Sequence, residues 1–140
     1  MKARSLDKET TLVSGSLFSG GGVGDVGIEW GVGIPVIAAC ELVPSRAALI
    51  RGNFPETKVF EGDVWTLQQD YVDYFRSKLK GRRPWLLTLS PPCQGMSSNG
   101  AGRISASIRS GKRPREDERN RLILPGINVL EQLQPDWFVL

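Results

Sequence analysis

The chain has 140 residues, with 18 basic and 15 acidic side chains, a formal net charge of +3 and no histidine. This length supports one domain with a real hydrophobic core. The mild positive charge is compatible with nucleic acid but does not require it. Without histidine, Ser-His-Asp and Cys-His catalysis are excluded, and the commonest metal ligand is missing.

Cysteine usage and hydropathy further narrow the class of protein to which the chain can belong. The two cysteines, Cys40 and Cys93, lie 53 residues apart with no Cys-x-x-Cys spacing, so we expect neither a metal site nor a disulfide scaffold. A reducing, intracellular compartment fits this pattern. The longest apolar stretch, residues 31–40, is too short to cross a bilayer, and the charged N-terminus lacks a signal-peptide core. We therefore expect a cytoplasmic protein with no membrane partner.

In chain order, a polar leader at residues 1–10 precedes one domain at residues 11–140. Strands are expected at 11–18, 35–41, 58–60, 86–89 and 137–140, and helices at 25–30, 44–52, 67–79 and 119–133. Gly31 should close the first helix, and Pro44 takes a favourable first position in the second. Pro125 and Gly126 should interrupt the last helix. This alternation predicts an α/β fold with a parallel, doubly wound sheet.

The first strand leads into a glycine-rich turn at residues 19–24. The spacing Gly22-x-Gly24-x-x-Gly27 matches the dinucleotide pattern, and Glu41 follows Gly22 by 19 residues at the end of the second strand. A carboxylate there could accept hydrogen bonds from a ribose diol. These residues alone leave NAD and another adenosine cofactor equally open, with a ligand-free flexible turn as a third interpretation.

Asp63 follows the short third strand and has two interpretations. It could accept a hydrogen bond from an adenine amino group, or it could cap a helix that starts near Trp65. In a parallel sheet its carboxylate would share an edge with the glycine turn and Glu41. Three strand ends would then converge on one adenosine-shaped ligand.

Cys93 stands directly after an apolar run that ends in Ser90-Pro91-Pro92. Two successive prolines end strand pairing and stiffen the exit, so the thiol would be presented at the carboxyl end of a strand, as a nucleophile requires. The alternative is a buried cysteine acting as a small apolar residue. The polar residues that follow Cys93 favour exposure.

Two segments concentrate positive charge. Residues 76–83 hold five basic and no acidic side chains, and residues 103–121 hold seven against three. Phosphate binding and an ordinary solvated surface explain such runs equally well. Residues 94–115 form the one long stretch without periodicity, which is typical of a functional or disordered loop.

Together these motifs resemble the cytosine-C5 DNA methyltransferase family over residues 11–140. The matching elements are residues 16–29, Glu41 with Pro44 and 53–55, 62–63, 90–94, and Asp117-x-Arg119-x-x-Leu122. The resemblance implies a Rossmann-like S-adenosylmethionine-dependent methyltransferase fold that is incomplete at its C-terminus. It also disfavours NAD, because an NAD enzyme has no evident use for the Pro-Pro-Cys element.

The resemblance implies a set of site residues. Cys93 would be the nucleophile, Glu41 would hold the ribose of S-adenosylmethionine and Asp63 its adenine. The full cofactor-binding set is Phe18, Ser19, Gly20, Gly22, Glu41, Leu42, Asp63, Val64, Pro91 and Leu122. Gln94, Ser97, Ser98 and Arg119 would contact double-stranded DNA. No metal site is implied.

Two positions depart from the family pattern. Ser16 stands where an acidic residue is common, and Leu42 stands where a bulky or aromatic neighbour of the adenine is frequent. Both departures could weaken cofactor affinity without abolishing it.

The implied reaction begins with addition of the Cys93 thiolate to C6 of a cytosine flipped out of the duplex. C5 then takes the methyl group and loses its proton, and the thiolate leaves. The implied biology is bacterial or phage DNA methylation in the cytoplasm or nucleoid, with the target sequence undetermined. A non-catalytic DNA-binding or interaction module is the alternative.

The chain ends where the family's next motif, Glu-Asn-Val, would begin. We therefore expect the isolated chain to have negligible activity and a second chain or segment to supply that motif and the target-recognition region. Residues 137–140 would form a terminal apolar strand with an unpaired edge, which predicts dimerisation, aggregation or a dedicated partner.

Overall fold

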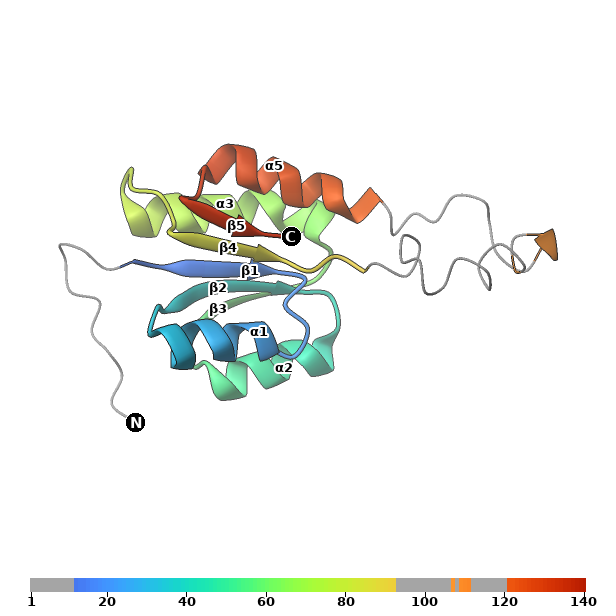
Figure 1. Cartoon of the computed structure of the whole chain (residues 1–140), viewed down its shortest axis with the longest axis horizontal. Coiled ribbons are helices and arrows are strands. Elements are labelled where there is room, and N and C mark those ends of the chain that lie inside the picture. The colour runs from blue at the N-terminus through green and yellow to red at the C-terminus, as the bar shows by residue number, and fades with distance from the viewer. Residues whose placement is uncertain (1–11, 93–106, 108, 112–120) are drawn as a thin grey trace.

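The computed structural model describes residues 12–92, 107, 109–111 and 121–140. Its five strands form one sheet in the order β3-β2-β1-β4-β5, and every neighbouring pair is parallel (Figure 1). The strands are β1 (Ser14–Leu17), β2 (Val36–Glu41), β3 (Lys58–Glu61), β4 (Leu86–Leu89) and β5 (Trp137–Val139). The predicted α/β class and parallel sheet are confirmed.

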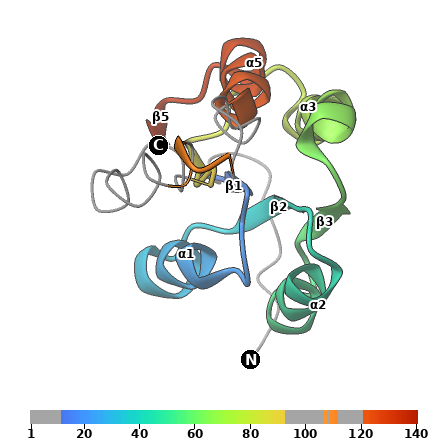
Figure 2. The same cartoon turned by 90° about the vertical axis from the view of Figure 1, so that its right-hand side faces the viewer.

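Helices cover both faces of the sheet (Figure 2). On one face lie α1 (Val23–Val26), its π-helical continuation η1 (Gly27–Val32) and α2 (Pro44–Asn53); on the other lie α3 (Val64–Leu79) and α5 (Ile123–Leu133). The chain builds β2 and β3 to one side of β1, then crosses to β4 and β5 on the other. The carboxyl ends of β1 and β4 therefore flank the point where strand order reverses, which is where open α/β sheets bind ligands.

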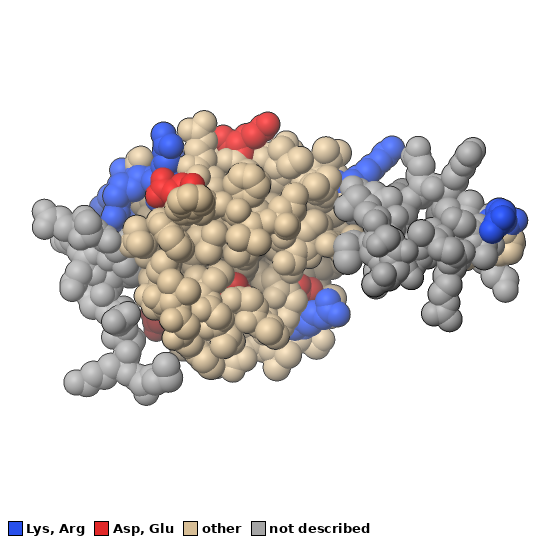
Figure 3. All heavy atoms as spheres, viewed as in Figure 1, with Lys and Arg blue, Asp and Glu red and all other residues tan. Residues whose placement is uncertain are grey.

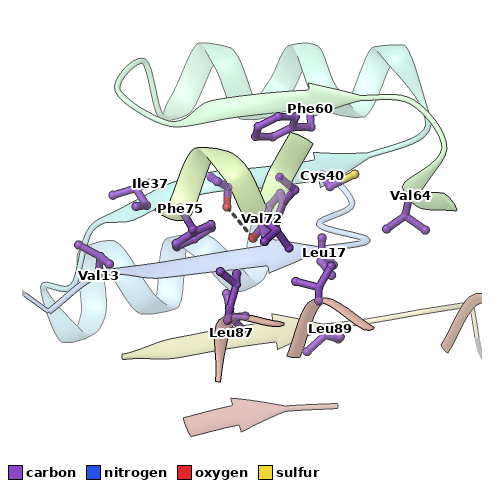
Figure 4. Close-up of a cluster of buried hydrophobic side chains, with 14 of the residues drawn as sticks. Val13, Leu17, Ile37, Cys40, Phe60, Val64, Val72, Phe75, Leu87 and Leu89 are labelled. Atoms are coloured by element: carbon purple, nitrogen blue, oxygen red, sulfur yellow. Dashed lines mark hydrogen bonds between the residues drawn. The ribbon is translucent and has the colours of Figure 1, made fainter. Parts of the chain in front are cut away.

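The larger core cluster lies between the sheet and helices α3 and α5 (Figure 4), and a smaller cluster of Ala39, Ile50 and Phe54 involves the sheet and α2. All six residues of β2 and all four of β1 are buried, as expected for central parallel strands. Gly15 allows α3 to approach closely, because a Cβ there would overlap the Tyr71 hydroxyl and the Phe75 ring. This packing holds β1 rigidly, and with it the turn that follows.

The starts of α2 and α3 are explained by their first residues. In α3 a side chain accepts a backbone N–H of the first turn, and in α2 a proline there has no N–H to satisfy. Helix α3 starts at Val64, three residues before the predicted start, because the Asp63 carboxylate caps it by accepting the Trp65 N–H at 2.9 Å. Pro44 does occupy the first turn of α2.

Two expectations about helix breaks are wrong. Gly33, at φ 81°, closes the first helix instead of Gly31, because the wider π-helical turn carries the helix past Gly31. Pro125 and Gly126 do not interrupt the last helix: α5 starts at Ile123, so Pro125 falls in its first turn, where an N–H has no intrahelical partner. Gly126 permits close packing, because its Cβ would lie 2.6 Å from Leu89 Cδ2.

The sheet ends in an uncovered strand. Each residue of β5 is exposed, and Trp137, Phe138, Val139 and the following Leu140 keep 58–64% of their surface accessible. β5 pairs only with β4 among the described residues. Of the helices described, none is long and apolar enough to cross a bilayer.

The predicted leader at residues 1–10 and most of the predicted loop at 94–115 lie outside the described residues.

Candidate functional site

The turn after β1 is strained and open. Phe18, Gly20 and Gly22 all adopt left-handed backbone conformations, at φ 57°, 59° and 80°. A left-handed phenylalanine is rare, and such a conformation costs about 1–3 kcal/mol, a strain found chiefly at functional sites. A Cβ at Gly20 would meet no heavy atom within 4 Å, so there is free space beside this backbone. A ligand can therefore approach it closely.

Glu41 joins the end of β2 to this turn. Its side chain is only 5% exposed; Oε2 accepts the Gly20 N–H at 2.7 Å and Oε1 accepts the Val43 N–H at 2.9 Å. Each carboxylate oxygen has a further lone pair, so the group can still accept a hydroxyl hydrogen. Leu42, next in the chain, is 64% exposed and offers an apolar surface at the same edge.

The end of β3 lies beside the end of β2. Glu41 and Glu61 are paired in register, and the Gly62 N–H donates to the Glu41 carbonyl at 3.0 Å. Asp63 follows as the cap of α3, so the capping interpretation is confirmed. Its Oδ1 makes that bond, and the exposed carboxylate retains Oδ2 for another donor. The Val64 side chain is buried in the core, so only its backbone could face a ligand.

The end of β4 lies on the other side of the turn. Leu89 is in register with Leu17, and the Ser90 N–H donates to the Leu17 carbonyl at 3.2 Å. The chain therefore leaves β4 beside the glycine turn and passes through Pro91, half-buried, and Pro92, exposed. The predicted nucleophile Cys93 and the predicted DNA contacts lie outside the described residues; these contacts are Gln94, Ser97, Ser98 and Arg119.

Leu122 immediately precedes α5 and packs partly buried against the core, as Phe18 does. Ser19 anchors the turn to β2, because its N–H donates to the Cys40 carbonyl at 3.1 Å. Of the predicted cofactor residues, those from β1, β2, β3 and β4 are thus brought to one edge of the sheet.

Cys40 is unsuited to nucleophilic chemistry. It is 2% exposed among core side chains (Figure 4). Burial first, and then the nearby Glu41 and Asp63 carboxylates, raise the pKa of its thiol to about 12. The thiolate is the reactive form, so this cysteine is inert near neutral pH.

Sequence reasoning missed one buried pair beneath the turn. Asp25, in α1, is 2% exposed, and its Oδ2 accepts the Ser16 hydroxyl at 3.1 Å. The pKa of this carboxyl is raised to about 6: burial raises it and has the largest effect, the Ser16 hydrogen bond lowers it, and the nearby Glu29 carboxylate raises it. Ser16 was singled out as lacking the expected acid. The signal that could have found the pair is the aspartate nine residues later, on the helix that returns over the same strand.

The basic segment 76–83 lies away from this edge. It spans the end of α3 and the connection to the start of β4, so it belongs to the opposite end of the strands. Figure 3 shows basic side chains gathered at that end. A role in phosphate binding stays a prediction, but these residues cannot contact a ligand held at the glycine turn.

The surface also has a hollow of about 410 Å³ between α3 and α5. It is lined by Trp65, Thr66, Gln68, Gln69, Asn128, Glu131 and Gln132. None of these is a predicted site residue, and the hollow lies between helices instead of over the strand ends.

We call the carboxyl edge of β1 and β2, with the turn at residues 19–24 and the side chains of Glu41 and Leu42, the glycine edge. This glycine edge fits an adenosine cofactor with a cationic tail. It offers an open backbone turn at Gly20, a carboxylate at Glu41 with spare acceptor capacity, and an exposed apolar side chain at Leu42. The buried Asp25 adds negative charge beneath the turn. S-adenosylmethionine has a ribose, an adenine and positive charge. The Glu41 carboxylate suits the ribose, the apolar Leu42 side chain suits the adenine, and the negative charge of Asp25 suits the positive charge.

Comparisons with known proteins agree with this geometry. The model of the family described as C-5 cytosine-specific DNA methylase matches residues 13–140. Type II methyltransferase M1.HgaI of Avibacterium volantium is 33% identical over 125 residues, covering 89% of this chain and 32% of the relative. Type II methyltransferase M.AquIA of a Picosynechococcus strain is 31% identical over 125 residues, covering 89% and 46%.

A solved structure has the same fold. It is described as a DNA modification methyltransferase encoded within an E. coli prophage, and it matches with a TM-score of 0.65 and 25% identity over 91% of this chain and 30% of its own. The chain thus spans about a third of that protein and of M1.HgaI, and just under half of M.AquIA. Because the family model matches residues 13–140, nearly the whole chain, the chain belongs to the C-5 cytosine-specific DNA methylase family.

Proposed function

We propose that this chain is the cofactor-binding and nucleophile-bearing part, residues 11–140, of a DNA cytosine-C5 methyltransferase that uses S-adenosylmethionine. The observation that carries the proposal is the Glu41 bridge. One buried carboxylate fixes the glycine turn to the end of β2, between the end of β3 and the exit of β4. The adenosine part of the cofactor would span these ends.

Each cofactor-binding residue has a distinct role in this proposal. Glu41 would accept the ribose hydroxyls, and Asp63 would accept the adenine amino group through its remaining oxygen. Leu42 would pack on the adenine, with the Val64 backbone beside it. The turn residues Phe18, Ser19, Gly20 and Gly22, together with Pro91 and Leu122, would line the rest of the pocket.

Cys93 would perform the covalent step. S-adenosylmethionine, when bound, supplies an electrophilic methyl group. The Cys93 thiolate would add to C6 of the cytosine, which makes C5 nucleophilic; after C5 is methylated and loses its proton, the thiolate would leave and restore the ring. Cys40 cannot replace Cys93, because its thiol is buried and its pKa is about 12.

Double-stranded DNA is the proposed substrate, with the target base flipped into the site at a cost of a few kcal/mol. Gln94, Ser97, Ser98 and Arg119 would contact the DNA. M1.HgaI and M.AquIA are named Type II methyltransferases, which supports a role in bacterial or phage restriction–modification, in the cytoplasm or nucleoid.

A further segment, from a second chain or from this protein, would pair with the free edge of β5. The support is the row of exposed apolar side chains from Trp137 to Leu140, which a covering strand would remove from water. The 140 residues contain no Glu-Asn-Val, the motif that holds the family's general acid. The isolated chain should therefore bind cofactor but transfer methyl groups negligibly.

Titration calorimetry tests the cofactor assignment. The 140-residue chain should bind S-adenosylmethionine and not NAD, and Glu41→Ala should abolish the heat of binding. Glu61→Ala, an exposed glutamate on the neighbouring strand, is the matched control and should bind as the wild type does. Preference for NAD, or unchanged binding in Glu41→Ala, would overturn the assignment.

Covalent trapping on duplex DNA containing 5-fluorocytosine, with S-adenosylmethionine present, tests the nucleophile, because fluorine in place of the C5 proton prevents release of the thiolate after methyl transfer. The assay is run on the chain together with the segment that completes it. Wild type and Cys40→Ser should give a denaturant-stable adduct, and Cys93→Ser should give none. If Cys93→Ser still binds DNA and wild type never forms an adduct, the chain is a binding module without this chemistry.

A further inference from the structure

Asp25 is a buried carboxylate with few partners. It is 2% exposed, and among the described residues its one hydrogen bond is from the Ser16 hydroxyl to Oδ2 at 3.1 Å. No basic side chain among the described residues forms an ion pair with it. The charged group that acts on it is Glu29, which has the same sign. Buried carboxylates normally have several donors or a cation, so this one is incompletely compensated.

The carboxylate is linked to the glycine turn by hydroxyl groups. Ser16 Oγ lies 2.7 Å from Ser19 Oγ. When Asp25 is ionised, Ser16 donates its single hydrogen to Asp25. The Ser19 hydroxyl then has three acceptors within reach, the carbonyls of Ser16 and Cys40 at 3.3 and 3.2 Å and Ser16 Oγ at 2.7 Å, and it donates to the nearest, Ser16 Oγ. The two hydroxyl dipoles then both point toward Asp25, and the negative charge is coupled to Ser19, at the start of the turn whose Gly20 N–H binds Glu41.

The proposed function divides the cofactor between the strand ends. Glu41, after β2, takes the ribose, and Asp63, after β3, takes the adenine. Across the sheet order β3-β2-β1, the amino-acid tail then falls at the end of β1, beside the turn that leads into α1, where Asp25 is bonded to Ser16. The tail ends in an ammonium group, and Asp25 has no such positively charged partner among the described residues.

We propose that Asp25, reaching Ser16 from α1, is the acidic residue of the glycine turn in this protein and positions the cofactor by attracting the ammonium group of its amino-acid tail. The inference rests on the proposed function and adds a named residue to it. It also explains the serine at position 16: the carboxylate is placed on the helix instead of the strand, and the two residues share one hydrogen bond.

A purely structural role predicts different behaviour. A carboxylate needed only for folding should stabilise the protein, and its loss should weaken all ligands equally. Burial instead raises the pKa of Asp25, so the ionised group opposes folding at neutral pH. If Asp25 opposes folding but attracts a cation, removing its charge should not destabilise the protein. It should weaken the binding only of ligands that carry the ammonium group.

The experiment compares S-adenosylhomocysteine with methylthioadenosine, two thioethers of which only the first has the amino-acid tail. Affinities are measured by calorimetry for wild type, Asp25→Asn and the exchange variant Ser16→Asp with Asp25→Ser. Asp25→Asn should weaken S-adenosylhomocysteine about tenfold, as expected for one charge-assisted contact, and leave methylthioadenosine unchanged. The exchange variant should recover wild-type affinity for both ligands within about threefold.

Other outcomes separate the two levels of the proposal. Equal weakening of both ligands in Asp25→Asn, or tighter binding of S-adenosylhomocysteine, would overturn the role of Asp25 and leave the cofactor assignment intact. A folded wild type that binds neither ligand nor S-adenosylmethionine would overturn the proposed function and this inference with it. Because Asp25→Asn should be the more stable protein at neutral pH, thermal melting confirms that its effect on binding is not due to unfolding.

Discussion

The glycine edge and strand β5 depart from an ordinary protein surface in opposite ways. At the glycine edge, polar groups are buried: Asp25 and Glu41 are 2% and 5% exposed. At β5, apolar groups are exposed: Trp137 and Phe138 keep 64% and 59% of their surface accessible. A buried polar group and an exposed apolar patch are the informative exceptions to normal burial. The first supports the proposed charged ligand, and the second supports the proposed polypeptide partner.

Within the glycine edge the two buried carboxylates also differ. Glu41 accepts two backbone N–H groups, whereas Asp25 accepts one hydroxyl among the described residues. Glu41 therefore builds the turn, and Asp25 remains an incompletely compensated charge beneath it. Four measurements test these differences, between the two carboxylates and between the glycine edge and β5.

The largest effect is expected from the pH dependence of stability. The folded-state pKa of Asp25 is raised from 3.8 to about 6, so between these values the folded protein binds more protons than the unfolded chain. The free energy of unfolding should therefore fall as pH rises through this window, by about 3 kcal/mol in all. Urea denaturation should show the fall in wild type and not in Asp25→Asn. Asp70→Asn, an exposed position on α3, is the control; parallel profiles in wild type and Asp25→Asn would contradict the prediction.

Glu41→Gln should have the next largest effect. An amide can accept only one of the two N–H groups that Glu41 binds, and its own NH₂ would face the other. The amide also leaves one fewer charged acceptor for the ribose hydroxyls that Glu41 is proposed to bind. One such hydrogen bond is worth about 2 kcal/mol, so affinity for S-adenosylmethionine should fall roughly 30-fold. Calorimetry beside Glu61→Gln gives the comparison. A loss no greater than in that control would show that the bridge does not build the site.

Alanine substitutions at two glycines should have smaller effects on stability, of opposite sign. The Cβ of Gly126→Ala would lie 2.6 Å from Leu89 Cδ2, and such overpacking should cost about 1–3 kcal/mol. Gly52→Ala, in α2 with no atom within 4 Å of its Cβ, should stabilise by about 0.5–1 kcal/mol. Denaturation midpoints measure both. The same sign of change in the two variants would mean that α5 does not press on β4 as described.

The smallest effect on stability should come from Phe138→Lys, within about 0.5 kcal/mol, because the side chain is exposed. Its effect on association should be clear, since a charge on an edge strand opposes pairing. Light scattering at high micromolar concentration should find the wild type associated and this variant monomeric. Leu49→Lys, at another exposed apolar position, should remain associated. A monomeric wild type would remove the argument for a partner on β5.

Much of the fold could be predicted because parallel strands buried on both faces are short apolar runs between turn residues. The strand at 86–89 matches β4, and the others differ from the structure by a few residues at most. Helix ends were less predictable, since Gly31 and Gly33 are both plausible closing residues by sequence. Only the hydrogen bonding of the π-helical turn selects Gly33. Pro125 suggests an interruption by sequence alone, because the pattern does not reveal that α5 starts only two residues before it.

The candidate site was predictable where function depends on local spacing. Gly20, Glu41 and Asp63 each follow a strand, and parallel strands bring their carboxyl ends to one edge regardless of packing detail. The Ser16–Asp25 pair was not predictable in this way, because its members meet only when α1 folds back over β1.

The order of residues along the chain is enough to predict the alternation of strands and helices, the family, and which residues stand at the strand ends, because these depend on neighbours in sequence. It does not reveal that Cys40 is inert in the core, that Glu41 is bonded to Gly20, that Asp25 is buried against Ser16, or that β5 is uncovered. These properties depend on burial and on contacts between residues distant in sequence. Such contacts exist only once the helices have packed on the sheet.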